Sequence, residues 1–200
     1  DVISCLDENE LKWNACSAGD VAALIADDKV VGVINGRYEF GPRALGFRSI
    51  LADPRPAENW PRINRTVKFR DDFRPFAPAM LVEDAAAFWG DGAAPVESPY
   101  MLLAPVMNDS AAENLGATIH ADRTCRLQTV DAAFNPSLHG VLTAFKALTG
   151  IGALLNTSLN VSGESIIADV EDLLAMLAFS GLDAIAVDNA ILVEKRGNET

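Results

Sequence analysis

Basic side chains gather in one fifth of an otherwise acidic chain. The 200 residues carry a formal net charge of −12, yet nine of the 16 Lys and Arg residues lie between positions 37 and 74, together with only five acidic residues. Cations held together in this way suit a small polyanion such as a phosphate, although a solvated basic surface is the alternative. We call this segment the basic island; its cations are Arg37, Arg43, Arg48, Arg55, Arg62, Arg65, Lys68, Arg70 and Arg74.

The loop from Gly36 to Gly46 could bring backbone amides and a cation to such an anion. Its two later glycines bracket the Pro42-Arg43 step, and the loop follows a buried apolar run. Open α/β sheets bind ligands at strand-end loops of this kind. The segment is not a known nucleotide motif, because the chain contains neither GxxxxGKS/T nor GxGxxG. A tight turn with a surface ion pair would explain the same residues.

Residues 68–78 alternate charged and aromatic side chains. In an extended conformation Lys68, Arg70 and Arg74 would share one face, while the phenylalanines anchor the other. Two X-Pro steps stiffen the segment and lower the entropic cost of holding its charges in place. The alternative is a solvated basic edge that pairs with neighbouring acidic residues.

Neutral polar side chains follow the apolar run at residues 151–155. They can donate hydrogen bonds to phosphate oxygens and to a carbonyl-like group without adding charge. A turn that satisfies its own backbone is the competing explanation. Arg126, alone on a predicted strand, is by itself more typical of an ion pair than of a ligand contact. The neutral side chains are Asn156, Thr157, Ser158 and Asn160.

Histidine and cysteine are too sparse for a metal site or a disulfide framework. His120 and His139 are not at ligand spacing with each other or with a cysteine, and the three cysteines form no CxxC pair. Unpaired thiols fit a cytoplasmic location. No apolar run approaches the roughly 20 residues of a membrane span. A pI near 4.5 opposes nucleic-acid binding. We therefore expect no protein-held metal, no membrane and no nucleic-acid partner.

Strands and helices interleave along the chain, which predicts one α/β domain with a mixed sheet flanked by helices. Residues 1–28 would form a lead-in with one helix capped by Asp20, and residues 29–196 the domain itself. Residues 90–98 look like a loop, and 107–116 are the best candidate for a mobile flap. Strands are expected at 30–34, 49–52, 79–82, 100–106, 126–130, 151–156, 184–187 and 190–193. Helices are expected at 21–27, 57–67, 84–89, 137–148 and 169–180.

Four ordered strings resemble the C-terminal domain of the O-carbamoyltransferases of nodulation-factor and antibiotic biosynthesis. They read GRYEFGPRALGFRSILADPR, VKFRDDFRPFAPA, CRLQTV and LLNTSLNVSGES, and the match extends over roughly residues 30–195. The resemblance implies a YrdC-like fold with a twisted mixed sheet and a positively charged cavity. It also implies formation of carbamoyl adenylate from carbamoyl phosphate and ATP, with Mg²⁺ accompanying the nucleotide.

In that family a preceding actin/hexokinase-like domain, which holds an iron ion, passes the carbamoyl group to a hydroxyl of the acceptor. We expect that domain to be absent from this chain and to be its partner in the complete enzyme. The acceptor therefore cannot be read from these residues.

The resemblance also implies roles for site residues. Asn156 and Asn160 would hold the carbamoyl amide and nearby oxygens. Leu159 and Ser165 replace the usual Phe and Pro of the last string, which affects loop geometry rather than the polar residues. The residues implied to be catalytic are Lys68, Arg74 and Arg43. Those implied to bind substrate are Arg37, Arg70, Arg126, Asn156, Thr157, Ser158, Asn160 and Glu164, of which Arg37, Arg70 and Glu164 match motif positions without an individual role.

Two other functions compete with this one. A binding module could keep a nucleotide or carbamoyl-phosphate cavity without catalysis. A YrdC-like domain could instead act in tRNA threonylcarbamoylation, against which the acidity of the chain and the GPRALG and NTSLN strings both speak.

Overall fold

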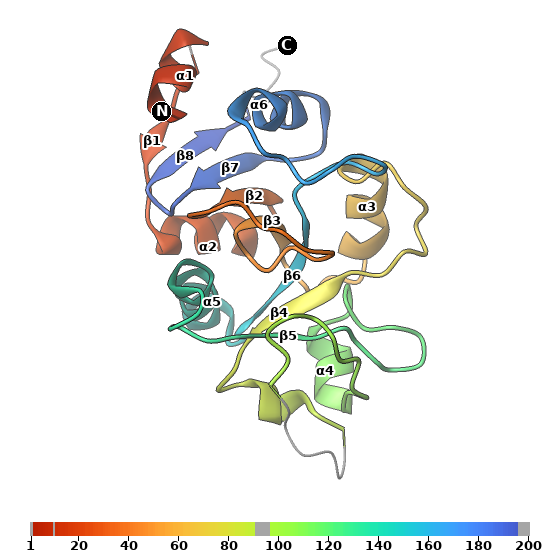
Figure 1. Cartoon of the computed structure of the whole chain (residues 1–200). Coiled ribbons are helices and arrows are strands. Elements are labelled where there is room, and N and C mark those ends of the chain that lie inside the picture. The colour runs from red at the N-terminus through yellow and green to blue at the C-terminus, as the bar shows by residue number, and fades with distance from the viewer. Residues whose placement is uncertain (1, 10, 91–96, 196–200) are drawn as a thin grey trace.

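The residues that the structure describes build one mixed sheet of eight strands (Figure 1). The computed structural model describes residues 2–9, 11–90 and 97–195, so most of the predicted loop at 90–98 lies outside the described residues. The strand order is β1-β8-β7-β2-β3-β6-β4-β5. The β7–β2 and β4–β5 pairs are parallel and the others antiparallel. The strands are β1 (Asn14–Ala15), β2 (Val31–Ile34), β3 (Arg48–Ala52), β4 (Ala77–Leu81), β5 (Gln128–Val130), β6 (Ala153–Ser158), β7 (Ala184–Val187) and β8 (Ile191–Glu194).

Helices cover both faces of this sheet (Figure 1). α2 and α5 pack on one face, and α3 and α6 pack on the other. α4 and the 3-10 turn η1 form a third, smaller cluster beyond β4 and β5. The α/β class and the mixed sheet expected from the sequence are confirmed. The helical elements are α1 (Val2–Glu8), α2 (Ala18–Ala26), α3 (Asn59–Thr66), η1 (Ala85–Phe88), α4 (Asp109–Asn114), α5 (Pro136–Thr149) and α6 (Val170–Phe179).

Strand β3 shows why the centre of the sheet is buried on both sides. Ile50 and Ala52 belong to the cluster under α3 and α6, whereas Leu51 belongs to the cluster under α2 and α5. Successive side chains of a strand point to opposite faces, so an unbroken apolar run requires cover on both. The central strands therefore form a rigid floor for the loops at their ends.

Caps at the helix ends follow from local sequence. Ser17 is the N-cap of α2, and Asp20 is the third residue of a capping box. The Asp20 carboxylate accepts a hydrogen bond from the backbone N–H of Ser17. The prediction that Asp20 is the cap is therefore wrong by three residues. Asn135 caps α5 before Pro136, and the left-handed Gly150 ends this helix.

The predicted strand at 100–106 is wrong. Met101 has a φ of +54°, which interrupts an extended chain. Leu102 is 78% exposed, and only Val106 forms an isolated bridge, with Thr124. The apolar run thus has no sheet edge to join and crosses the surface as irregular chain.

The predicted mobile flap at 107–116 is also wrong. This segment contains α4, whose N-cap Asn108 accepts a hydrogen bond from Ala111 N. Met107, Ala111 and Leu115 are spaced by four residues and are all buried in the third cluster. The sequence contains this helical spacing, but the polar residues between the three apolar ones obscure it.

The predicted alternation over residues 68–78 holds for the charges but not for the aromatic side. Phe69 has a φ of +48°, so the segment is not extended there. Phe69 and Phe73 are 55% and 75% exposed, and only Phe76 is buried. The aromatic side therefore has a single anchor, at the point where β4 begins. The remaining predicted strands and helices lie within a few residues of their expected bounds.

Within the described ranges, we find no helix that combines the length and the apolar character needed to cross a membrane.

The lead-in contains two elements, α1 and β1, that the sequence analysis did not predict. β1 adds one strand to the edge of the sheet beside β8. α2 buries Val21, Ala22 and Ile25 against the sheet.

Gly46 is the tightest point of the loop between β2 and β3. Its φ is +102°, and a Cβ atom there would lie 2.5 Å from Leu138 Cδ2 and 2.8 Å from Asn135 Nδ2. Asn35 Nδ2 donates to its carbonyl at 3.0 Å, and its N–H donates to Ser49 Oγ at 3.0 Å. No other residue type fits this position without moving the loop away from α5.

Replacing this glycine should therefore cost more than backbone strain alone. We expect Gly46→Ala to lower the free energy of unfolding by about 3 kcal/mol, from a left-handed backbone and a forced close contact. Gly150→Ala is the control, because its φ is +83° but no atom lies within 4 Å of the added Cβ. That variant should lose about 1 kcal/mol. Denaturant unfolding measures both, and equal losses would contradict the close contact.

Candidate functional site

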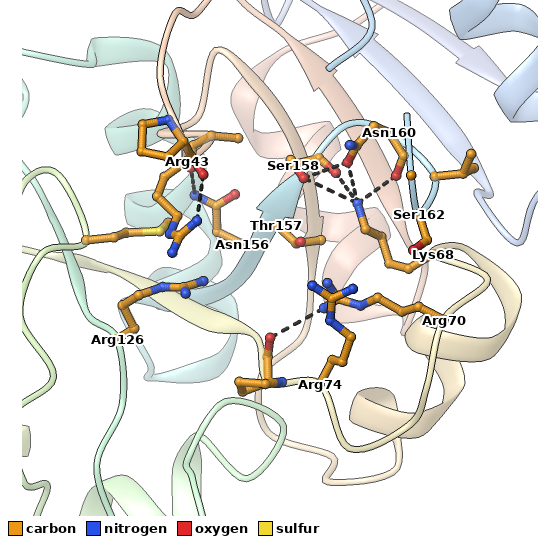
Figure 2. A pocket seen from close by; sticks show the side chains of 16 residues that line it. Arg43, Lys68, Arg70, Arg74, Arg126, Asn156, Thr157, Ser158, Asn160 and Ser162 are labelled. Carbon is orange, nitrogen blue, oxygen red and sulfur yellow. Dashed lines mark hydrogen bonds between the residues drawn. The ribbon is translucent and has the colours of Figure 1, made fainter. Parts of the chain in front are cut away.

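A polar cavity of about 290 Å³ opens where the loop after β2, the segment before β4 and the end of β6 meet (Figure 2). Nine of the eleven predicted site residues line it, although they are spread over more than 110 positions of the sequence. They are Arg43, Lys68, Arg70, Arg74, Arg126, Asn156, Thr157, Ser158 and Asn160.

Two predicted residues lie elsewhere. Arg37 is exposed at the start of the loop, and Glu164 is exposed beyond the cavity, beside α6. Glu164 contributes only its backbone carbonyl, which accepts a hydrogen bond from Asn160 Nδ2 at 2.6 Å. The cavity wall also includes residues that the sequence reading did not single out, and nothing in their types marked them. They are Pro42, Ala44, Pro75, Met101, Val161, Ser162 and Gly163.

Five cations face this cavity, and none of the described residues that line it is acidic. Figure 2 shows Arg43 and Arg126 on one side, with Lys68, Arg70 and Arg74 on the other. Over the described part of the chain, none of the five has a carboxylate within 4 Å. Their charge is therefore not neutralised by the protein, which favours an anionic ligand.

The other cations of the basic island are used differently. Arg55, Arg62 and Arg65 form ion pairs with Asp53, Asp28 and Asp72 respectively. Arg48 is buried and donates to the backbone carbonyls of Asn35 and Phe47 at 3.1 and 2.8 Å. The island thus divides into residues that hold the fold and residues that present charge.

Lys68 is a buried point charge held by oxygen atoms. Its Nζ donates to the carbonyls of Ser158 and Asn160 at 2.7 and 2.6 Å, and to Asn160 Oδ1 at 2.6 Å. Burial, together with the nearby guanidinium groups of Arg70 and Arg74, lowers the pKa of Lys68 to about 7. The free site therefore holds this charge at a cost that an incoming anion would relieve.

Arg70 and Arg74 are aimed by helix α3. Asn64 Oδ1 accepts from Arg70 Nε at 2.6 Å, and the Arg70 guanidinium lies over the Phe76 ring, 4.9 Å from its centroid. The Arg74 carbonyl accepts from Asn64 Nδ2 at 2.9 Å and from Trp60 Nε1 at 2.8 Å. Burial and the charges of Arg74 and Arg126 lower the pKa of Arg70 to about 10.

Arg126 and Arg43 complete the ring of charge from the other side. Burial, and to a lesser extent the Arg43 charge, lowers the pKa of Arg126. Arg126 Nε is buried and has no hydrogen-bond partner among the described residues. Arg43 is exposed, and its Nη1 donates to the carbonyl of Pro42 at 2.7 Å. Both guanidinium groups therefore keep donors for a ligand.

A half-buried carboxylate closes the loop that carries Arg43. Glu39 Oε1 accepts from Leu45 N at 2.7 Å, and Oε2 accepts from Arg48 N at 2.8 Å. Burial raises the pKa of Glu39, although these N–H groups and the charge of Arg48 oppose the rise. Sequence reasoning missed this residue, because an acid within a basic string suggested charge balance rather than a backbone clamp.

Asn156 supplies a neutral wall to the cavity. Its Nδ2 donates to the Ala44 carbonyl at 3.2 Å and to Gln128 Oε1 at 2.7 Å. Its Oδ1 is buried without a partner among the described residues. The Asn160 oxygen, in contrast, is already used by Lys68 and by Ser158 Oγ.

No group of three or more His, Cys, Asp or Glu side chains in the described part of the chain could hold a metal ion. The donors around the cavity are amides, hydroxyls and cations. This set binds phosphate oxygens and planar oxyanions through hydrogen bonds and charge. None of the described lining residues is a His, Cys, Asp or Glu, the side chains that most often bind metal ions in proteins.

Comparison with known proteins gives a consistent family. The family model "Carbamoyltransferase C-terminus" matches residues 22–195. Nodulation protein NolO of Bradyrhizobium diazoefficiens is 45% identical over 179 residues, which cover 90% of this chain and 32% of NolO. The 3'-hydroxymethylcephem-O-carbamoyltransferase of Amycolatopsis lactamdurans is 39% identical over 168 residues, covering 84% of this chain and 31% of that protein. The chain thus spans about a third of the length of these relatives.

Two solved structures share the fold. Full-length HypF aligns with a TM-score of 0.60 at 20% identity, covering 90% of this chain and 26% of HypF. Sua5 of P. abyssi aligns with a TM-score of 0.57 at 14% identity, covering 90% of this chain and 49% of Sua5. Together they confirm the YrdC-like fold that the family resemblance implied.

The lowered pKa of Lys68 predicts that anion binding takes up a proton. A bound anion raises this pKa from about 7, because opposite charges stabilise each other. At about pH 8 the free amine is mostly neutral and the bound amine mostly charged, so affinity should fall as pH rises above 7. Titration calorimetry with sulfate, in buffers of different ionisation enthalpy, measures the uptake. Lys68→Met should abolish it, and uptake that survives in this variant would assign the proton to another group.

Proposed function

Because the chain belongs to the family of carbamoyltransferase C-terminal domains, we propose that it forms carbamoyl adenylate from carbamoyl phosphate and ATP. It does so as the C-terminal part of an O-carbamoyltransferase, whose remaining part passes the carbamoyl group to a hydroxyl. The observation that carries the proposal is a cavity with five cations and one buried amide oxygen, none of which has a neutralising or hydrogen-bonding partner for that charge or oxygen among the described residues.

The charge of the cavity suits two phosphorylated ligands at once. Carbamoyl phosphate and ATP repel each other, so bringing them together needs several fixed cations. Charge-assisted hydrogen bonds contribute roughly 1.5–3 kcal/mol each, and three or four would hold both phosphate chains. Arg43 and Arg126 on one side and Arg70 and Arg74 on the other can each present a planar fork to oxyanions.

The neutral wall suits the carbamoyl group. Its NH₂ can donate to Asn156 Oδ1, the acceptor that no described residue uses. Thr157, the next residue of β6, also lines the cavity and offers a hydroxyl to nearby oxygens. Asn160 serves mainly to hold Lys68, since its oxygen already accepts from that ammonium group.

The proposed reaction has two steps. Carbamoyl phosphate and water give carbamate and phosphate. A carbamate oxygen then attacks the α-phosphorus of ATP, the bond from that phosphorus to the bridging oxygen breaks, and pyrophosphate leaves with the electron pair. Carbamate and its adenylate are both lost to water, so the site must exclude solvent while they exist.

The cations act on the charge that moves in this displacement. Negative charge grows on the pyrophosphate oxygens as the bond breaks, and the charges of Arg74 and Lys68 would stabilise it. Magnesium enters as part of the nucleotide substrate. The described lining residues include no carboxylate, so phosphate and water oxygens would supply most of its ligands.

The first test is release of AMP and pyrophosphate from ATP, with and without carbamoyl phosphate. We expect both products only when carbamoyl phosphate is present, because carbamate is the nucleophile. Saturable ligand binding without turnover would instead support a binding module whose catalysis needs the rest of the protein. Absence of both binding and turnover would overturn the proposal.

The cation ring predicts a specific loss in an arginine variant. Arg74→Ala should lower the rate of pyrophosphate release on the order of 10²–10³, since the lost charge acts on the transition state. Its side chain is exposed, so the fold should survive, which thermal denaturation checks. Arg123→Ala is the matched control: this arginine is exposed, pairs with Asp109 and does not line the cavity. Unchanged turnover in Arg74→Ala would remove this residue from the mechanism.

A further inference from the structure

Gln128 lies behind the cavity and does not line it. It is 1% exposed on β5, and both ends of its amide are used. Nε2 donates to the Leu45 carbonyl at 2.9 Å, and Oε1 accepts from Asn156 Nδ2 at 2.7 Å. The side chain thus joins the Arg43 loop to the neutral wall of the cavity.

The direction of these bonds is set by a backbone group that cannot turn over. The Leu45 carbonyl is an acceptor only, so the end of Gln128 that faces it must be the NH₂ group. Asn135 Nδ2 donates to the same carbonyl at 3.1 Å, and Glu39 holds the N–H of Leu45 at 2.7 Å. Leu45 therefore has both of its backbone polar groups fixed.

The same reasoning fixes Asn156. Its Nδ2 faces two acceptors, the Ala44 carbonyl and Gln128 Oε1. Turning the amide over would bring Oδ1 against two oxygens, and each lost bond leaves a buried group unsatisfied at a cost of about 1–3 kcal/mol. The oxygen of Asn156, rather than its NH₂ group, is therefore held ready for a ligand.

We propose that Gln128 is the positioning residue that makes the cavity select a carbamoyl group. By fixing Asn156 with its buried, unpartnered oxygen as the acceptor left for a ligand in the cavity, it favours a ligand with an N–H donor over anions of the same shape that carry a methyl group or an oxygen. This inference rests on the proposed function and adds to it the basis of substrate discrimination.

The cations cannot supply this discrimination. They bind the phosphate group of any acyl phosphate equally, because they interact only with its charge and its oxygen atoms. A methyl group opposite Asn156 Oδ1 leaves that buried acceptor without a partner, and a site built to hydrogen-bond a substrate rejects analogues that lack the bond. Selectivity thus depends on one neutral oxygen and on what keeps it in place.

Two stable phosphonates distinguish recognition of the ligand's charge from recognition of its N–H donor. Phosphonoacetamide and acetonylphosphonate have the same shape and charge and differ only in an NH₂ or a CH₃ group. We expect this chain to bind the amide at least about tenfold more tightly, which corresponds to one hydrogen bond of about 1.4 kcal/mol. Calorimetry on the native chain gives this ratio directly.

Variants at position 128 then test whether Gln128 fixes the orientation of the Asn156 amide. Gln128→Met removes the acceptor that holds Asn156 Nδ2, so the amide can turn and the two affinities should come within about threefold. Gln128→Glu keeps an oxygen opposite Asn156 and, at a pH where its carboxyl group is protonated, a donor to the Leu45 carbonyl. At that pH it should keep the preference, even if both ligands bind more weakly. Thr129→Val is the control, because its hydroxyl accepts from Ser98 N on the opposite face of β5.

The outcomes distinguish this inference from the proposed function. If the native chain binds neither phosphonate, the proposed function fails as well. If it binds both equally, or if Gln128→Met keeps the full preference while folded, the proposed function stands and the role of Gln128 is wrong. Should Gln128→Met fail to fold, Gln128→Glu decides: loss of the preference there overturns the inference, and retention supports it.

Discussion

Mutual repulsion between cations is the constraint on which the rest of the site depends. Five positive groups face one cavity with no acid among the described residues that line it. Burial, and after it the repulsion of neighbouring arginines, lowers the pKa values of Lys68 and Arg70. A fold that tolerates this must hold each group by other means, because the charges alone would push the segments apart.

Neutral anchors solve this problem without using up the charge. Carbonyl and amide oxygens hold Lys68, while an amide of α3 and the face of Phe76 hold Arg70. A carboxylate in any of these places would stabilise the free protein but weaken its attraction for an anion. Carboxylates are used instead where the cation is structural, as in the Arg55–Asp53 pair.

Sequence patterns predicted what depends on local signals. The interleaved apolar runs predicted the mixed sheet, and the clustering of basic residues pointed to Arg43, Lys68, Arg70 and Arg74. The polar run after residue 155 and the family resemblance pointed to the other five predicted residues that line the cavity. What could not be predicted depends on tertiary contacts. The run at 100–106 looked like a strand, but among the described residues only Val106 forms an isolated bridge. Phe69 and Phe73 remain exposed, because Phe76 and helix α3 between them hold the cation segment. Glu39 and Gln128 were missed for the same reason, since the partner of each is a backbone group identified only by the fold.

The cavity is built from segments near positions 43, 70, 126 and 158, so it exists only once the strands that carry them have come together. Residues 43–74 carry four of the five cations, but Arg126 and the neutral wall at residues 156–160 join them only in the folded sheet. Ligand occupancy and completion of the fold are therefore thermodynamically coupled, and a ligand at a hundred times its dissociation constant adds about 2.7 kcal/mol to stability. An anion that occupies this cavity would therefore raise the fraction of the domain that is folded.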